Sequence, residues 1–424
     1  MRSLRRILFG TAVGLFLFWG TGVSPLKTAD AQAHAGVAYV PGRLLVGHRK
    51  GIDLAVIDRA VKLQDTVIRR QSLELGFSVL EVPEASSEIV MASLMRTGLF
   101  TYVERDYYAH TAAVPNDPSY GSQWYLPKIH SPEAWSVTTG SAAVIVAVVD
   151  SGVDGTHPDL ASKLVPGWNF VAPNTGTADV LGHGTAVAGT LAAASNNDIG
   201  VAGVNWASKI MPLVVVDESD FAAYSDIASA FQYAADRGAR VINASVGGPN
   251  PSDTLENAVE YAWNKGAVIF AAAMNNSTSS PYYPAAYAHV VAVSATDNND
   301  HLASFSNYGN WIALSAPGTN ILTTVRGGGY SYWNGTSFAA PIAAGVAALC
   351  LAVNPTLSNS ALVSLLDETA DDVGGAGYSA SFGWGRINAY RAVSAAQGPP
   401  GPDATPRRHP RPAAPAEGTP RQGR

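Results

Sequence analysis

The sequence has little cysteine and few charged residues, and each shortage narrows the classes of protein that it fits. Cys350 is the only cysteine among 424 residues, so no disulfide can form within the chain. It falls in an apolar stretch that predicts a helix, where a buried structural thiol is expected rather than a nucleophile. The net charge of −6 gives no sign of nucleic-acid binding.

Long apolar runs are also scarce. One apolar run lies at residues 7–20, after three arginines among the first six residues. A polar stretch follows it and ends at Ala31-Gln32-Ala33. This pattern predicts a secretory signal over residues 1–33 with cleavage before His34, and a retained membrane anchor is the alternative. We therefore expect a secreted protein, extracellular or periplasmic, without stable membrane association. The lack of further runs excludes a multi-pass membrane protein.

Hydrophobic residues, in contrast, make up 47% of the chain, which is enough for a large core and more than one folded unit. Residues 34–113 alternate strand and helix patterns, which predicts a small α+β, ferredoxin-like unit with helices on one face of a short antiparallel sheet. The predicted strands are 42–49, 66–72, 77–83 and 101–110, and the predicted helices are 53–63 and 86–97.

Residues 114–396 alternate nearly unbroken apolar strands with amphipathic helices, as expected when helices cover both faces of a parallel sheet. We predict an α/β fold with a doubly wound, mostly parallel sheet, whose sites lie beyond the carboxyl ends of the strands. Residues 397–424, rich in Pro and Arg, are expected to form a disordered tail. The predicted strands are 142–150, 210–217, 239–246, 266–274, 290–296 and 312–318, and helices fall near 184–195, 223–237, 253–264, 337–353 and 358–367.

The segment Gly335–Pro341 places a serine behind a glycine turn, at the start of a long helix of small residues. Ser337 would lie at the positive end of the helix dipole, next to unpaired backbone amides. A serine in this position can attack a carbonyl carbon, and its own amide can hold the resulting oxyanion. Taken alone, however, the serine is more simply interpreted as an N-cap.

Three further polar residues stand at strand ends or helix starts of the same unit. Asp150 closes the first long strand, His183 lies between two glycines at a helix start, and Asn275 follows the strand at 266–274. Singly, each is explained as a turn, cap or incidental residue. Together, in the order Asp…His…Asn…Ser, they supply an orienting carboxylate, a base, an oxyanion donor and a nucleophile.

With these residues the chain resembles the subtilisin-like serine peptidases (subtilases), and in detail their thermitase branch. The order Asp…His…Ser is the order found in subtilisin. The resemblance spans the whole larger unit, and residues 34–113 resemble the inhibitory, chaperone-like propeptide of the family. The matching stretches include VAVVDSGVDGTHPDL, GHGTAVAG, VINASVGG, YAWNKGAVIFAAAMN, SFSNYG and NGTSFAAP.

The resemblance implies a role for each site residue. His183 would take the proton of Ser337 and return it to the leaving amine, while Asp150 fixes the imidazole. The Asn275 side chain and the Ser337 amide would bind the oxyanion. The substrate backbone would pair, as an added strand, with Ser245, Val246 and Gly247.

Calcium is the cofactor that the resemblance implies, in a site built from oxygen atoms, as this ion prefers. The alternative is that the carboxylates serve only as turn and cap residues. A second, thermitase-like site is expected to be lost, because Asn169, Ala172 and Asn174 stand where carboxylates would be needed. The implied ligands of the first site are the side chains of Asp117, Asp159 and Asn197 and the backbone carbonyls of Ala194, Ile199 and Val201.

Two departures from the family pattern concern the primary specificity pocket. Met274 stands where the family usually has a glycine in the pocket wall, and Tyr282 stands where the pocket floor usually has a small residue. Two bulky side chains should narrow the pocket, so we expect a preference for small residues such as Ala before the scissile bond. Ala112 and Ala113, at the end of the propeptide segment, fit this preference.

Other departures lie outside this pocket. Ala186, Phe338 and Ile342 replace residues that the family uses in helix packing, which leaves the chemistry untouched. Asp220 and Phe221 occupy a substrate edge that usually contains glycines, and are expected to reshape binding further from the scissile bond.

The sequence thus predicts a secreted, self-processing serine endopeptidase. Its expected partners are peptide substrates and its own propeptide, and it is expected to be a monomer. One rival hypothesis is a catalytically silent, peptide-binding relative, against which the complete set of four site residues argues. A second rival, a lipase or esterase of the α/β-hydrolase kind, fails because its residues would follow the order Ser…Asp…His.

Overall fold

The structure, a computed structural model, describes residues 39–64, 66–107, 113–375 and 377–398. The predicted signal peptide, Ala112 and the predicted tail beyond residue 398 lie outside the described residues.

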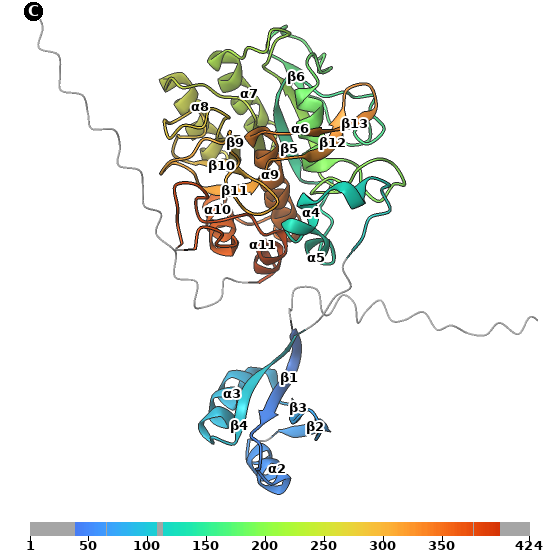
Figure 1. Ribbon diagram of the computed structural model, residues 1–424, viewed down its shortest axis with the longest axis vertical. Coiled ribbons are helices and arrows are strands. Elements are labelled where there is room, and N and C mark those ends of the chain that lie inside the picture. Colours follow the sequence, from blue (N-terminus) through green and yellow to red (C-terminus); the bar gives the residue numbers. More distant parts are fainter. Residues whose placement is uncertain (1–38, 65, 108–112, 376, 399–424) are drawn as a thin grey trace, which may run out of the picture. The chain divides into compact units, whose positions relative to one another are not determined.

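The N-terminal unit is a four-stranded antiparallel sheet with strand order β2-β3-β1-β4 (Figure 1). Its chain order of strand, helix, two strands, helix and strand, together with this sheet order, confirms the predicted ferredoxin-like fold. Two helices pack on the sheet through one core that includes Leu44, Ile57, Leu80, Leu94 and Phe100. The elements are β1 (Tyr39–His48), α2 (Leu54–Lys62), β2 (Val67–Ser72), β3 (Phe77–Glu81), the 3-10 turn η1 (Glu84–Ser86), α3 (Ser87–Arg96) and β4 (Phe100–Tyr107).

The larger unit is organised around a seven-stranded sheet with strand order β11-β10-β9-β8-β5-β7-β6, in which every pairing is parallel (Figure 1). The predicted strands are confirmed, and β6 is an addition of two residues, too short to leave a periodic signal. The strands are β5 (Ile145–Asp150), β6 (Trp168–Asn169), β7 (Lys209–Val214), β8 (Val241–Ala244), β9 (Val268–Ala272), β10 (Val290–Thr296) and β11 (Leu314–Pro317).

Helices cover both faces of this sheet, which confirms the doubly wound layout. Alternate residues of β5 show the division, because Val146 and Val148 pack in one core whereas Ala147 and Val149 pack in the other. The first core contains α6 (His183–Ala192), α9 (Thr336–Val353), α10 (Asn359–Thr369) and α11 (Ala389–Ala396), with the short α4 (Tyr125–Lys128) and α5 (Ser131–Trp135) after the turn η2 (Tyr120–Ser122). The second core contains α7 (Tyr224–Asp236) and α8 (Asp253–Asn264).

The long helix α9 passes through the first core. Among the described residues it is the one helix long and apolar enough to cross a membrane, and 89% of it is buried inside the fold. A hairpin of β12 (Ile321–Val325) and β13 (Gly329–Trp333), which the sequence did not predict, leads directly into it. This hairpin positions the glycine turn at Gly335.

The order of the strands places the site. The chain runs from β5 to β7 on one side and then returns to β8 on the other side of β5. The carboxyl end of β5 is therefore the topological switch point of the sheet, where open α/β sheets form their binding crevice. Asp150 is the last residue of β5.

Candidate active site

Asp150 and His183 form a hydrogen-bonded pair at the carboxyl end of β5. The Asp150 carboxylate is fully buried, and its oxygens lie 2.8 and 3.0 Å from Nδ1 of His183. The Ser151 amide also donates to Asp150 at 2.8 Å. A Cβ on Gly184 would lie 2.1 Å from the Gly152 carbonyl oxygen and 3.1 Å from Asp150, so the glycine after His183 permits this close approach.

Asp179, which the sequence analysis missed, holds the start of the helix that carries His183. Its carboxylate accepts the amides of Leu181, Gly182 and Thr185 at 3.0, 2.7 and 2.8 Å, and the Ser151 hydroxyl at 2.8 Å. A carboxylate at a helix N-terminus also interacts favourably with the helix dipole. The sequence did contain a signal for this role, because Asp179 lies three residues before Gly182, the N-cap of the helix.

The electrostatic surroundings of His183 favour its protonated form. Burial of the imidazole lowers the pKa of His183, but the charge and hydrogen bond of Asp150 and the charges of Asp220 and Asp179 outweigh burial. The pKa of His183 therefore lies above its ordinary value of about 6.5. Asp220 was predicted to affect only distant substrate binding, and the structure adds this effect on the imidazole.

Ser337 is the second residue of α9 and does not cap it. The N-cap is Gly335, and no side chain caps this end of the helix, so the interpretation of Ser337 as an N-cap is wrong. Ser337 is 8% exposed, and within the described residues its hydroxyl makes no hydrogen bond, including none to His183. The ring of the next residue, Phe338, lies 5.9 Å from the imidazole centre, which places the start of α9 beside His183.

Two hydrogen-bond donors converge in front of Ser337. The side-chain oxygen of Asn275 accepts the Thr336 amide at 2.9 Å and the Thr336 hydroxyl at 3.0 Å, which leaves its Nδ2 free to donate elsewhere. A Cβ built on Gly335 would lie 3.5 Å from that Nδ2 and 3.6 Å from the Ser337 amide nitrogen. Both donor nitrogens therefore border the space above Gly335.

The predicted substrate-binding residues follow β8 and β9. Ser245 is buried, and its hydroxyl donates to the Ser337 carbonyl at 2.9 Å, so it braces the nucleophile segment. Val246 and Gly247 are partly exposed, and Gly247 has no backbone hydrogen-bond partner among the described residues. A Cβ on Gly247 would lie 3.5 Å from Sδ of Met274, which brings the predicted pocket wall next to the predicted substrate strand.

Met274 has a left-handed backbone, with φ of 73°. This conformation is unfavourable for most residues other than glycine, which accounts for the glycine usual at this position. Tyr282 is partly buried and precedes Tyr283, whose backbone pairs with Gly248. Tyr282 thus precedes the residue that pairs with Gly248, directly after the predicted substrate strand.

The predicted calcium ligands gather around two buried carboxylates, Asp117 and Asp159. Asp159 accepts the Asn197 side-chain amide at 2.9 Å and the Val201 amide at 3.2 Å, and its own carbonyl accepts the Ala194 amide at 2.8 Å. Burial, assisted by the charge of Asp159, raises the pKa of the Asp117 carboxyl.

These residues offer oxygen atoms without partners. One carboxylate oxygen of Asp117 is buried without a hydrogen bond. Among the described residues, no backbone hydrogen bond uses the carbonyls of Ala194, Ile199 or Val201. The described residues contain no group of three or more His, Cys, Asp or Glu side chains that could hold a metal, so a cation here would need amide and backbone oxygens in addition to the two carboxylates. Such a set suits calcium.

Comparison with known proteins identifies the family of both parts of the chain. The model of the subtilase family matches residues 141–385, and the model of the fervidolysin N-terminal prodomain matches residues 25–106. The crystal structure of fervidolysin from Fervidobacterium pennivorans, a keratinolytic enzyme related to subtilisin, is similar with a TM-score of 0.62 and 29% identity, over 85% of this chain and 61% of that one.

Two relatives match this chain over most of their own length. A thermophilic serine proteinase of Bacillus sp. (strain AK1) is 41% identical over 378 residues, which are 88% of this chain and 93% of the relative. Thermitase of Thermoactinomyces vulgaris is 43% identical over 280 residues, which are 66% of this chain and 99% of thermitase. The chain therefore belongs to the subtilase family, as a thermitase-like serine endopeptidase with an N-terminal prodomain.

Proposed function

We propose that this endopeptidase cleaves peptide bonds through Ser337, His183 and Asp150, with Asn275 and the Ser337 amide as the oxyanion hole. The observation that carries the proposal is the convergence of the Asn275 and Ser337 donors above Gly335, beside an imidazole held by a buried carboxylate. Residues with only a structural role would not need both a positioned base and two nearby hydrogen-bond donors at the same place.

The steps follow from these positions. Nε2 of His183 takes the proton from Ser337 Oγ as that oxygen attacks the scissile carbonyl carbon. The carbonyl π electrons move to the oxygen, which becomes an oxyanion bound by Asn275 Nδ2 and the Ser337 amide. As the tetrahedral intermediate collapses, the C–N bond breaks and His183 returns its proton to the leaving amine. A water molecule then hydrolyses the acyl-enzyme by the same route, and Asp150 stays ionised throughout.

A fluorophosphonate probe tests this assignment, because it reacts only with an activated serine. Peptide mapping of the labelled, processed protein is expected to find the label on Ser337. A correctly processed sample that takes up no label would favour the silent, peptide-binding alternative.

We also propose that the chain is exported and matures by self-cleavage. A relative from Natrialba magadii, 39% identical over 397 residues, is named an extracellular protease. The basic and apolar N-terminus supports removal of residues 1–33, and the prodomain match supports a precursor that includes residues 34–113. N-terminal sequencing of the secreted form should give a start near Ala113, and a start within residues 2–40 would contradict processing.

The activity is expected to depend on pH through His183. Catalysis needs the neutral imidazole as a base, and the pKa of His183 is raised, so kcat/KM should fall with acid below a midpoint above pH 6.5. Asp220→Asn removes one of the charges that raise this pKa, so the midpoint should move to lower pH. The expected shift is about a few tenths of a pH unit, because interactions between exposed charges are weak.

Asn also suits the left-handed backbone at position 220, where φ is 64°. The measurement is the pH profile of kcat/KM on a chromogenic peptide, with Asp236→Asn on α7 as the charge-matched control. An unchanged midpoint in Asp220→Asn would show that Asp220 does not act on the imidazole.

Met274 is proposed to restrict the residue before the scissile bond. The wild type should hydrolyse an Ala-terminated chromogenic peptide faster than a Phe-terminated one. Met274→Gly removes the side chain beside Gly247 and suits the left-handed backbone, so it should raise the Phe/Ala ratio of kcat/KM by roughly tenfold. Faster hydrolysis of the Phe peptide than of the Ala peptide by the wild type would contradict this proposal.

Calcium is proposed to bind between Asp117 and Asp159 and to stabilise the larger unit. At a concentration of 100 times Kd, a bound ion adds about 2.7 kcal/mol, which should raise Tm by roughly 5 °C in a unit of this size. Asp117→Asn should lose most of this increment, whereas Asp236→Asn should keep it. Differential scanning calorimetry with calcium, magnesium or EDTA measures the increment, and an equal calcium response in Asp117→Asn would contradict the site.

A further inference from the structure

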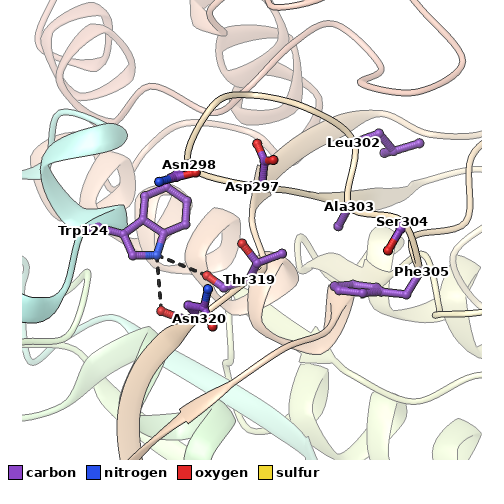
Figure 2. A pocket seen from close by; sticks show the side chains of 9 residues that line it. All are labelled: Trp124, Asp297, Asn298, Leu302, Ala303, Ser304, Phe305, Thr319 and Asn320. Atoms are coloured by element: carbon purple, nitrogen blue, oxygen red, sulfur yellow. Dashed lines mark hydrogen bonds between the residues drawn. The ribbon is translucent and has the colours of Figure 1, made fainter.

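A second concave site lies next to the oxyanion hole and takes no part in the steps above. It is a cavity of about 500 Å³ between the loops that follow β10 and β11. Figure 2 shows Trp124 and Phe305 on opposite sides of this hollow, with Thr319 between them. Its lining includes Trp124, Asp297, Leu302, Phe305, Thr319 and Asn320.

Both walls of the cavity are bonded to the segments that carry the oxyanion donors. On one side, the Asn320 amide donates to the Asn334 side chain at 2.8 Å, directly before Gly335, and the Gly335 amide donates to the Gly318 carbonyl at 2.8 Å. On the other side, the Ser277 amide, two residues after Asn275, donates to the Phe305 carbonyl at 2.9 Å. A peptide held in the oxyanion hole therefore passes close to this cavity.

The order of the strands shows on which side of the scissile bond the cavity lies. Ser245 to Gly247 follow β8, Asn275 follows β9 and Asp297 follows β10, and these strands are neighbours in that order. The proposed pocket for the residue before the scissile bond lies between the ends of β8 and β9. The cavity lies beyond Asn275, at the ends of β10 and β11, and so faces the leaving-group part of a substrate.

The lining combines apolar surface with one carboxylate, that of Asp297. Trp124, Leu302 and Phe305 supply the apolar part. One oxygen of the Asp297 carboxylate accepts the Asn299 and His301 amides, both at 2.9 Å, and the other lies 3.2 Å from Nδ1 of the exposed His301. No Lys or Arg of the described residues forms an ion pair with Asp297. The nearby Asp300 differs, because Lys128 and Arg386 both pair with it.

Asp297 is ionised at neutral pH. Burial by itself raises the pKa of its carboxyl, but the two backbone amides and His301 outweigh burial and hold the pKa below its usual range. Its side chain remains 31% exposed. An apolar cavity beside a partly exposed carboxylate matches a long basic side chain, which buries its methylene stem and presents its charged end to the carboxylate.

We propose that this cavity binds a Lys or Arg side chain of the substrate, at one of the first three positions after the scissile bond, and that Asp297 selects its charge. The proposal rests on the proposed function, since it places the cavity relative to the oxyanion hole. It makes the enzyme selective on both sides of the bond, for a small residue before it and a basic residue after it.

Internally quenched peptides test the proposal. All share an acyl part that ends in Ala, and they carry Arg, Leu or Glu at the first, second or third position after the bond. At one position kcat/KM should be about tenfold higher for Arg than for Glu, and this ratio should shrink as NaCl is raised. Asp297→Asn, which keeps an acceptor for the loop amides, should lower the ratio to about twofold, whereas the remote Glu260→Gln on α8 should not.

A p-nitroanilide peptide has no residue after the bond and separates the two proposals. Wild type and Asp297→Asn should hydrolyse it equally. Failure of the wild type to hydrolyse it would overturn the proposed function itself. Normal hydrolysis without Arg preference at any position, or with a preference that survives Asp297→Asn or 1 M NaCl, would overturn the cavity assignment. The salt series uses the wild type alone, so it decides the matter even if the variant is unstable.

Discussion

Replacing Ser337 with alanine is expected to lower kcat by at least about 10⁴-fold and to leave the precursor uncut. The reason is that the hydroxyl oxygen is the proposed attacking atom. The neighbouring site residues His183 and Asn275 have no hydroxyl group that could replace it. The fold should survive, because the Ser337 hydroxyl makes no hydrogen bond within the described residues. The backbone carbonyl of residue 337 would still accept the hydrogen bond from the Ser245 hydroxyl.

Three measurements check this result: turnover of a chromogenic peptide, uptake of a fluorophosphonate probe, and N-terminal sequencing of the secreted protein. Ser331→Ala on β13, an exposed position, is the matched control and should retain full activity. Normal maturation of Ser337→Ala would show that another protease cuts the precursor. Residual labelling of the variant would place the nucleophile elsewhere.

Gly335→Ala is expected to lower kcat by at least about 10²-fold, with little change in KM. The added Cβ would occupy the space that lies 3.5 Å from Nδ2 of Asn275 and 3.6 Å from the Ser337 amide, where the oxyanion must fit. Removal of a single such donor in subtilisin costs about 10²–10³-fold in kcat, and the methyl group would obstruct both donors. The loss should appear in kcat because these bonds strengthen only in the transition state.

Backbone strain has to be separated from obstruction in this experiment, because φ of Gly335 is 150°. Gly327→Ala is the matched control. It also has a positive φ, of 93°, but its added Cβ would meet no atom within 4 Å. Both variants should lose some stability, whereas only Gly335→Ala should lose catalysis. An active Gly335→Ala enzyme would show that the oxyanion is held somewhere else.

Much of the fold was predictable because its signals are local. Six apolar runs predicted six strands of the parallel sheet, and the alternation in residues 34–113 predicted the ferredoxin-like unit. The β12–β13 hairpin was missed because β12 is buried along most of its length and lacks the alternation expected of a half-exposed strand. The segment α11 was missed as a helix, because eight residues give little periodic signal.

The candidate site divides in the same way. Asp150, His183, Asn275 and Ser337 each stand at a strand end or helix start, positions that a sequence pattern reveals. Asp179 was missed because its importance lies in the amides around it, which only the folded loop brings together. Likewise, the sequence allowed Ser337 to be an N-cap, and the structure assigns that place to Gly335.

The sequence by itself indicated most of the elements, their order and the residue types at the ends of the strands, because hydrophobic periodicity and turn chemistry act between near neighbours. Only the tertiary structure decided which groups meet. It brought Asn275 and Ser337 together above Gly335, set Met274 beside Gly247 and formed the cavity at Asp297. These contacts join segments distant in the chain, and their geometry depends on strand order and core packing rather than on any local pattern.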